Sequence, residues 1–389
     1  MIVKKNLGVA VIEPVGGHGG ANYYDFGLCD GIATTGVDVV LHTCDETQGK
    51  GVTFEVRRDF RHIYGKAAAW RRGLRYGVGL LRALVSAVRE GRQVCHFHFY
   101  HVGVLQIAEL TLARLLRRRV VVTAHDVESF VDALEVPRLS RWAYAMAHRI
   151  IAHNQTSRAE LIARLGVEPS RIRVIPHGSY IGLTPSLPPQ SVARAKLELD
   201  ACSYVVLFFG QIKQVKGLDV LLQAVAKLAP VYPSLRLLIA GRPWHTQFAE
   251  YQSLINKLEI ESRCNLYVRY IDDNEAAFFF SAADLVVLPY RRIYQSGVLL
   301  MAMSYAKPVI VSDLPGMTEV VEHGRTGMIF RTGDADNLAE RIRVAIDDPE
   351  RCALMAEAGY RYVREYHDWR LIGQSTCLVY RDLVSCVTD

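Results

Sequence analysis

The chain has 389 residues, half of them apolar, which is too long for one hydrophobic core and suits two domains of ordinary size. Its net charge of +6 comes from 46 basic and 40 acidic residues, an excess that fits anionic ligands or surfaces and does not require nucleic acid. The eight cysteines form no C-x-x-C pair, so neither a disulfide framework nor a zinc knuckle is expected, and a reducing cytosol fits best. No apolar run approaches the roughly 18 residues of a membrane span, so any membrane contact should be peripheral.

Strand-like and helix-like segments alternate along the first half of the chain. The first apolar run ends at Glu13 and Pro14, so we interpret it as a buried strand and not as a signal peptide. The alternation predicts an α/β domain with a doubly wound parallel sheet. The expected strands are residues 7–12, 37–42, 94–99, 120–124, 150–153 and 172–176.

A second alternation follows a segment with three prolines between residues 182 and 190, which is typical of a linker. Strands near Val205, Leu235, Leu266, Asp284 and Pro308 predict a second α/β domain. The tail from residue 367 has a helical pattern and should pack back on the first domain. The predicted domains are therefore residues 1–183 and 184–366, followed by a C-terminal helix at 367–389, and two such domains imply a ligand cleft between them.

One candidate anion site begins where the apolar run 285–289 ends at Pro289. A helical pattern from Gln295 to Ala306 follows after a short loop, so the helix should start at the carboxyl edge of a parallel strand. The backbone amides of Gln295, Ser296 and Gly297, together with the positive end of the helix dipole, would then face a ligand. This arrangement is typical of a phosphate-binding site.

A second candidate anion site of the same kind lies in the segment 205–229. An apolar strand runs into Gly210, a polar loop carries Lys213 and Lys216, and Gly217 precedes an amphipathic helix. A lysine in such a loop can reach a diphosphate as a point charge. The alternative is that both lysines are ordinary solvated loop residues.

Histidines mark the first half of the chain. His125 follows the strand 120–124 and precedes Asp126, at an edge where ligands collect, although it could instead be a capping histidine satisfied by the backbone. His96, His98 and His101 form H-x-H-x-x-H, which leaves a zinc site as an alternative use of these side chains.

Two further motifs exclude other classes of protein. Asp334 and Asp336 imitate a metal-binding D-x-D, but they follow Gly333 and open a helical segment, so we interpret them as helix-capping residues. The GGHGG loop at 16–20 lacks the G-x-G-x-x-G spacing, and no G-x-x-x-x-G-K-[ST] occurs. Dehydrogenase and P-loop ATPase interpretations therefore lose their main support.

Five blocks of sequence, in this order, resemble glycosyltransferase family four, whose members are retaining enzymes of the GT-B fold. The blocks are GGHGG (16–20), TAHD (123–126), VIPHG (174–178), FFGQIKQVKGLDVLLQA (208–224) and SGVLLMAMSYAKPVIVSDLPGMTEVVEHGRTG (296–327). The resemblance implies two Rossmann-like domains facing a central cleft, with a nucleoside diphosphate sugar held by the second domain and an acceptor held by the first. It also implies no divalent metal and no cofactor apart from this co-substrate.

The resemblance assigns roles to individual positions. It implies that His125 and Lys216 are catalytic, with His125 near the reacting sugar carbon and Lys216 on the donor diphosphate. The implied donor-binding residues are Gly17, Gln211, Lys216, Tyr270, Ile271, Ser296, Gly297 and Glu319. The implied acceptor-binding or sugar-binding residues are Gly16, His18, Gly19, Asp126 and His177.

The chain departs from the family pattern at three positions. Gln211 stands where an arginine is usual, and Ile293 and Met301 stand where two glutamates eight residues apart are usual. These departures leave open a catalytically silent GT-B homologue that acts as a binding or partner subunit. A sugar-nucleotide epimerase or a phosphorylase is a further alternative.

A helical pattern between residues 71 and 89 carries arginines 71, 75, 82 and 89 on one stripe and Leu74, Val78, Leu81, Val85 and Val88 on the next. This face could lie on an anionic membrane, or the apolar stripe could be buried in the first domain. The resemblance, taken together with this helical pattern, implies a cytoplasmic, peripherally membrane-associated, retaining hexosyltransferase. We expect it to use a UDP- or GDP-linked sugar and a glycan or polyprenyl-diphosphate-linked acceptor in polysaccharide biosynthesis.

Overall fold

The computed structural model describes residues 7–17, 20–49, 53–126, 137–244 and 246–385. The chain divides into two compact units, Met1–Gly178 together with Tyr366–Asp389, and Ser179–Glu365. The division between Gly178 and Ser179 falls a few residues before the proline segment in which the linker was predicted. The C-terminal segment belongs to the first unit.

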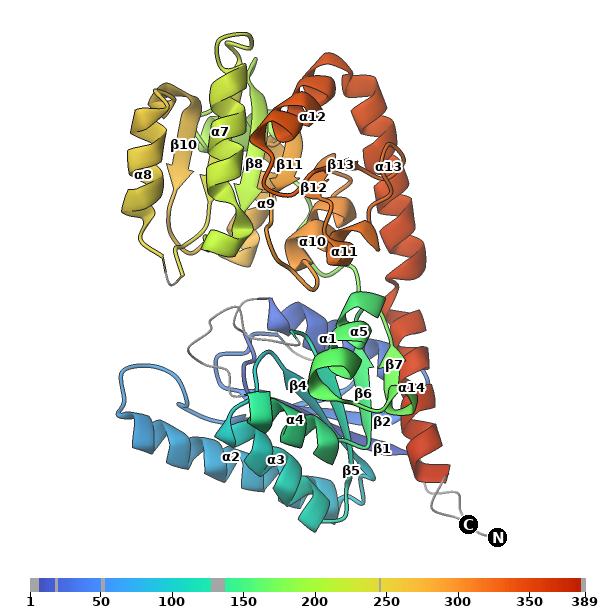
Figure 1. Cartoon of the computed structure of the whole chain (residues 1–389). Coiled ribbons are helices and arrows are strands. Elements are labelled where there is room, and N and C mark those ends of the chain that lie inside the picture. Colours follow the sequence, from blue (N-terminus) through green and yellow to red (C-terminus); the bar gives the residue numbers. More distant parts are fainter. Residues whose placement is uncertain (1–6, 18–19, 50–52, 127–136, 245, 386–389) are drawn as a thin grey trace. The chain divides into compact units, whose positions relative to one another are not determined.

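The first unit is built on a seven-stranded parallel sheet with the order β3-β2-β1-β4-β5-β6-β7 (Figure 1). Its strands are β1 (Gly8–Glu13), β2 (Asp38–Cys44), β3 (Glu55–Phe60), β4 (Val94–Phe99), β5 (Arg119–Ala124), β6 (Arg149–Ala152) and β7 (Ile172–Val174). Its helices are α1 (Ala21–Ala33), α2 (Ala69–Arg89), α3 (Val104–Leu115), α4 (Pro137–Met146), α5 (Gln155–Leu165) and α14 (Trp369–Ser385). All six residues of β1 are buried, as expected for a central strand covered on both faces.

The C-terminal helix α14 packs closely on α1. A Cβ added to Gly373 would lie 2.1 Å from the carbonyl carbon of Gly31, and one added to Gly31 would lie 2.0 Å from the carbonyl oxygen of Trp369. Only glycine therefore allows the two backbones to approach this closely. The predicted return of the C-terminal helix to the first domain is confirmed.

The second unit repeats the design with a six-stranded parallel sheet of order β10-β9-β8-β11-β12-β13. Its strands are β8 (Tyr204–Phe209), β9 (Leu235–Ala240), β10 (Cys264–Tyr267), β11 (Leu285–Leu288), β12 (Val309–Ser312) and β13 (Met328–Phe330). Its helices are α6 (Gln190–Lys196), α7 (Leu218–Leu228), α8 (Phe248–Lys257), α9 (Asp273–Ala282), α10 (Gly297–Ser304), α11 (Pro315–Thr318), α12 (Ala335–Asp347) and α13 (Pro349–Tyr366).

The strand order reverses direction at one point in each sheet, between β1 and β4 in the first unit and between β8 and β11 in the second. In open parallel sheets, ligands bind beyond the carboxyl ends of the strands at such a switch point. We therefore expect ligand-binding residues in the loops after β1 and β4, and in those after β8 and β11. The predicted α/β class with two doubly wound domains is confirmed.

Helix α2 presents an apolar stripe to solvent. Trp70, Leu74 and Leu81 have 67%, 64% and 51% of their surface exposed, and Val78, Val85 and Val88 are also exposed. The side of α2 that packs on the unit is formed by other residues, Gly79, Leu80, Ala83, Leu84 and Ala87. The alternative in which the stripe of Leu74, Val78, Leu81, Val85 and Val88 is buried is therefore wrong. Within the described part of the chain, no helix is long and apolar enough to cross a membrane.

Candidate functional site

The first part of the candidate site is the loop after β8 in the second unit. This loop contains a 3-10 turn, Gln214–Lys216, and then enters α7 through Gly217. Gly217 has a φ of +65°, and a Cβ at this position would lie 1.9 Å from the carbonyl oxygen of Pro289. Glycine is thus required for the loop to reach the end of β11, which brings Lys216 to the switch point of the sheet.

Lys216 is linked to the start of α10 through one buried side chain, Tyr290. The Lys216 ammonium lies 3.6 Å from the centroid of the Tyr290 ring, which is the geometry of a cation–π contact. The Tyr290 hydroxyl is hydrogen-bonded to the Ser296 side chain, and burial raises the pKa of Tyr290, so the phenol stays neutral. A fixed positive charge therefore stands beside the N-terminus of α10.

Helix α10 begins at Gly297, two residues later than the predicted helix. Ser296 is its N-cap, and the Ser296 Oγ accepts a hydrogen bond from the Leu299 amide at 3.2 Å. Of the three amides predicted to face a ligand, that of Gly297 is the first within the helix and that of Ser296 belongs to the N-cap, while Gln295 precedes the cap. The first helical amides, of Gly297 and Val298, have no acceptor within the helix and point along the positive end of its dipole.

The remaining predicted donor residues lie on several loops of the second unit. Gln211 is half-buried two residues after the end of β8, whereas Tyr270 is 56% exposed and Ile271 is buried after the edge strand β10. Glu319 is exposed at the end of α11, and its carbonyl accepts a hydrogen bond from the Tyr362 hydroxyl. The structure thus groups Gln211, Lys216, Ser296 and Gly297 at the switch point and places Tyr270 and Ile271 two strands away.

The first unit contains a cluster of histidines around the buried ring of Tyr24. The ring centroids of His98, His125, His153 and His177 lie 5.1, 4.5, 5.3 and 5.0 Å from that of Tyr24. Each of these four histidines lies at or just beyond the carboxyl end of a different strand, β4, β5, β6 or β7. We call them the Tyr24 histidine cluster.

The imidazoles of the Tyr24 histidine cluster are neutral. Burial lowers the pKa of His98 and His153 to about 3 and that of His177 to about 4. Burial and the neighbouring histidines hold the pKa of His125 well below its usual range. The cluster can therefore bind a ligand by hydrogen bonds rather than by positive charge.

His125, the predicted catalytic histidine, is held by another side chain. Its backbone amide donates to the carbonyl of Phe99 at 2.8 Å, while its ring Nδ1 lies 3.2 Å from His153 Nε2. The ring also stacks on Tyr100, with the centroids 4.4 Å apart. The alternative of a capping histidine whose ring is satisfied by the backbone is therefore wrong.

The other predicted sugar-binding residues lie near the same sheet edge. His177 follows β7, and its Nδ1 donates to the carbonyl of Gly178 at 2.7 Å, while Asp126 is half-buried after β5. Gly16 has a φ of +60°, and a Cβ there would lie 2.1 Å from Thr47 Oγ1. A Cβ at Gly17 would lie 2.8 Å from the carbonyl oxygen of Glu46, so packing within the unit already favours glycine at both positions. His18 and Gly19 lie outside the described residues.

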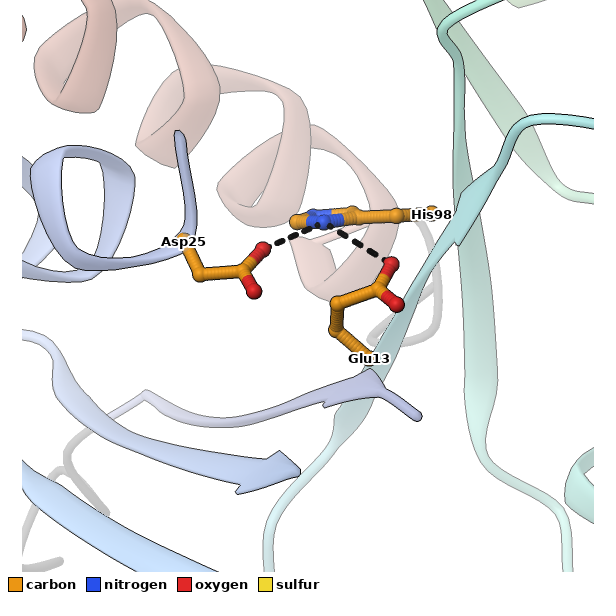
Figure 2. A group of neighbouring side chains, drawn as sticks. All are labelled: Glu13, Asp25 and His98. Carbon is orange, nitrogen blue, oxygen red and sulfur yellow. Dashed lines mark hydrogen bonds and ion pairs between the residues drawn. The ribbon is translucent and has the colours of Figure 1, made fainter. Parts of the chain in front are cut away.

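Glu13, Asp25 and His98 form a second buried group at the switch point of the first unit. Glu13 is the last residue of β1, and His98 lies near the end of β4. His98 Nδ1 lies 3.0 Å from Asp25 Oδ1 and 3.6 Å from Glu13 Oε2, and Figure 2 shows the imidazole between the two carboxyl groups. Their ligand atoms all lie within 4.8 Å of one another, so these three side chains are the described group that could hold a metal ion.

The two carboxyl groups of this group favour a bound proton over a bound metal ion. Burial raises the pKa of both Glu13 and Asp25, and the nearby carboxyl group of Asp25 raises that of Glu13 further. Carboxyl groups that keep their protons are poor metal ligands. Glu13 Oε1 also accepts the Val15 amide at 2.6 Å, so this side chain positions the start of the glycine loop.

The zinc alternative for the H-x-H-x-x-H motif is wrong. His96 uses both ring nitrogens, with the Tyr380 hydroxyl 2.6 Å from Nδ1 and Thr123 Oγ1 2.8 Å from Nε2. His101 is exposed and does not join the group of Glu13, Asp25 and His98. The capping interpretation of Asp334 is confirmed, because its carboxylate accepts the Asn337 amide at 2.9 Å at the start of α12.

The sequence analysis missed Tyr24, His153 and Tyr290. His153 was included in a strand that the structure ends at Ala152, and this places His153 at a carboxyl edge in the same way as His125. Tyr290 follows Pro289 directly after β11. A polar or aromatic residue directly after an apolar run was therefore the available signal for both.

Comparison with known proteins agrees with this geometry. The family model described as "Glycosyl transferases group 1" matches residues 190–362, and the one described as "Glycosyltransferase Family 4" matches residues 18–179. The sucrose-phosphate synthase of Thermosynechococcus elongatus superposes with a TM-score of 0.78 at 20% identity, over 98% of this chain and 100% of that chain. The two units therefore define a GT-B protein.

The chain belongs to the family-four glycosyltransferases, so the predicted family is confirmed. A protein named D-inositol 3-phosphate glycosyltransferase from Kineococcus radiotolerans is 28% identical over 253 residues. This match covers 61% of the present chain and 58% of that protein, so the chain spans less than two thirds of this relative. Anabaena HepE, solved in complex with UDP-glucose, has a TM-score of 0.74 at 20% identity, over 98% of the present chain and 100% of that chain.

Proposed function

We propose that the protein is a retaining, metal-independent hexosyltransferase that uses a UDP- or GDP-linked sugar. The acceptor in this proposal is a glycan or a polyprenyl-diphosphate-linked oligosaccharide of polysaccharide biosynthesis. The observation that carries the proposal is the arrangement of Lys216, Tyr290 and Ser296 beside the first amides of α10, at the switch point of the second sheet. The UDP and UDP-glucose complexes of Anabaena HepE support a nucleotide sugar as the ligand class.

The chemistry follows from the charges that the reaction moves. Departure of a nucleoside diphosphate leaves negative charge on the phosphate oxygens, and a positioned cation and backbone amides stabilise that charge most strongly in the transition state. Lys216 and the N-terminus of α10 would supply them. The acceptor hydroxyl can attack on the face that the diphosphate is leaving, with a phosphate oxygen taking its proton, so no strong protein base is required.

Binding of the donor is tested by thermal unfolding of the purified chain with UDP, GDP, ADP and their sugars. We expect one base to raise the unfolding temperature selectively, since a ligand at a hundredfold its Kd stabilises the folded state by about 2.7 kcal/mol. The absence of a shift with every nucleotide, in a protein that melts cooperatively, would overturn the proposal.

A catalytically silent homologue is the second candidate function. It is favoured by two apolar residues near the candidate donor site. Ile293 precedes α10 and Met301 lies within it, and neither side chain carries a carboxylate. A silent homologue can still bind nucleotide. Binding without release of nucleoside diphosphate from any nucleotide sugar would favour this candidate.

We propose further that α2 docks on the cytoplasmic, anionic face of a membrane. Trp70, Leu74 and Leu81 form an apolar stripe that is more than half exposed. Five arginines and no acidic residue lie on the same helix. An apolar face beside basic side chains is the composition of helices that lie in the interface of anionic membranes.

The double substitution of Leu74→Glu and Leu81→Glu should strongly reduce co-sedimentation with vesicles that contain phosphatidylglycerol. The substitutions place charge where the apolar stripe would enter the lipid, and neither side chain is part of the packed face of α2. Leu354→Glu is the matched control, since Leu354 is 71% exposed on α13 and should leave binding unchanged. Equal binding by all three proteins would rule out α2 as the docking surface.

A further inference from the structure

His125 presents a buried nitrogen without a partner. Its Nε2 is shielded from solvent, and among the described residues no atom accepts from it or donates to it. A buried polar atom of this kind costs free energy unless a ligand completes its hydrogen bonding. The chemical nature of the missing partner depends on whether Nε2 carries a proton.

The tautomer of His125 follows from its neighbours, starting at a backbone carbonyl. His153 Nδ1 lies 3.1 Å from the carbonyl oxygen of Ile175, and a carbonyl can only accept, so the His153 proton resides on Nδ1. A neutral imidazole carries one proton, so His153 Nε2 is an acceptor. His125 Nδ1, 3.2 Å from that atom, must therefore be the donor, and His125 Nε2 is left with a bare lone pair.

We propose that His153 is a positioning residue that holds His125 as the Nδ1–H tautomer, so that His125 Nε2 accepts a hydrogen bond from a sugar hydroxyl. This inference rests on the proposed function for the identity of the ligand, but not for the tautomer. The chain of donors runs from His125 through His153 to the backbone of Ile175, at the ends of three neighbouring strands. It selects a hydroxyl group and disfavours a carbonyl or phosphate oxygen, which could not donate to Nε2.

Neutral imidazoles are required for this arrangement. Burial and the surrounding histidines lower the pKa of His125, and burial lowers that of His153 to about 3, so both rings stay neutral at physiological pH. Among the described residues, the rings of Tyr24, His98, Tyr100 and His153 pack against His125, and His96 and His177 are its further titratable neighbours, so no carboxylate acts on its pKa. The tautomer is thus set by hydrogen bonding.

The test is the ring-nitrogen NMR spectrum of the full chain labelled with 15N-histidine, with His125 assigned from the His125→Asn variant. We expect a protonated Nδ1 and an unprotonated Nε2 at His125. His153→Phe removes the acceptor and should abolish this signature. His153→Gln should restore it, because one amide can accept from His125 through its oxygen and donate to Ile175 through its nitrogen. A protonated Nε2 in the native protein, or an unchanged His125 spectrum in His153→Phe, would overturn the proposal.

Turnover gives the second readout. His153→Phe should lower kcat/KM for the nucleotide sugar roughly ten- to a hundredfold, because the unsatisfied donor and the lost tautomer weaken one hydrogen bond to the sugar. His153→Gln should stay within a few fold of the native value. Equal losses in both variants would indicate a merely structural role and contradict the proposal. A native chain that turns over no nucleotide sugar would contradict the proposed function and leave the NMR result standing.

Discussion

Replacing Lys216 with alanine should lower the rate of nucleoside diphosphate release by roughly a hundredfold to a thousandfold. The lysine ammonium is held 3.6 Å from the Tyr290 ring, beside the helix start capped by Ser296, so it can meet a departing diphosphate without reorganising. Removal of one preorganised donor of this kind typically costs about 3–4 kcal/mol in the transition state. The loss should appear mainly in kcat, since the charge on the phosphate grows as the sugar bond breaks.

The Lys216 substitution has a matched control on the same stretch of chain. Lys227 lies in the last turn of α7 and pairs with the exposed carboxylate of Asp336. Lys227→Ala should leave turnover unchanged, because an exposed ion pair contributes little and lies outside the site. Lys216→Arg should retain part of the activity, since the charge is kept but the guanidinium has another shape. Near-native turnover by Lys216→Ala, with unchanged unfolding temperature, would contradict the assignment.

The free energy of unfolding of the first unit should fall steeply with pH below about pH 4.5. His98, His153 and His177 have folded-state pKa values of about 3, 3 and 4, well below the value of about 6.5 expected in the unfolded chain. Between these values the unfolded state binds protons that the folded state rejects, so the free energy of unfolding falls as the pH falls. Each such histidine contributes up to about 1.4 kcal/mol per pH unit.

Buried carboxyl groups act in the opposite direction. Burial raises the pKa of Glu109 to about 8 and also raises those of Glu13 and Asp25, so the folded state holds protons that the unfolded state has released. Their contribution to stability is present at low pH and is lost as the pH rises above about 4.5. Between about pH 4.5 and 6.5 the two effects oppose each other, and below about pH 4.5 only the histidine effect remains.

His177→Asn isolates one histidine. Asparagine can still donate to the carbonyl of Gly178 but does not titrate. Between pH 6.5 and 4, the free energy of unfolding of the variant should therefore fall by about 3 kcal/mol less than that of the native chain. Calorimetric unfolding at several pH values measures this difference. His62→Asn is the control, because the side chain of His62 is 75% exposed. Parallel curves for His177→Asn and the native protein would contradict the account.

Most strands that carry the core could be predicted because their apolar runs are continuous, but the three-residue strand β13 was not predicted although Met328 and Phe330 are buried in the core. Strand β3 was missed because its sequence, Glu-Val-Arg-Arg-Asp-Phe, is highly charged, as suits an edge strand whose Arg57 pairs with Glu55 and Glu90. Helix α10 was predicted to start too early because its periodicity alone does not show that the Ser296 side chain forms the cap. The local sequence pattern therefore predicted which helices and strands exist more accurately than it predicted the residues at which they begin and end.

The candidate site was predictable only in part. His125, His177, Lys216 and Ser296 were found because each belongs to a block that resembles the family. The grouping of these two histidines with His98 and His153 around Tyr24 was not found, because the four histidines lie at the ends of four different strands and Tyr24 lies on α1, and only the topology brings them together. The exposure of Leu74 and Leu81 on α2 also required the fold, since α2 carries a second apolar face around Leu80 and Leu84 that is the buried one.

The most direct test of the central claim is the release of nucleoside diphosphate from a panel of UDP- and GDP-linked hexoses by the native chain, with anionic vesicles and lipid-linked glycans present. We predict release from one donor class, transfer of the hexose with retention of its anomeric configuration, and loss of both in Lys216→Ala. A folded native chain that releases no nucleoside diphosphate from any donor would contradict the claim that this protein is a hexosyltransferase.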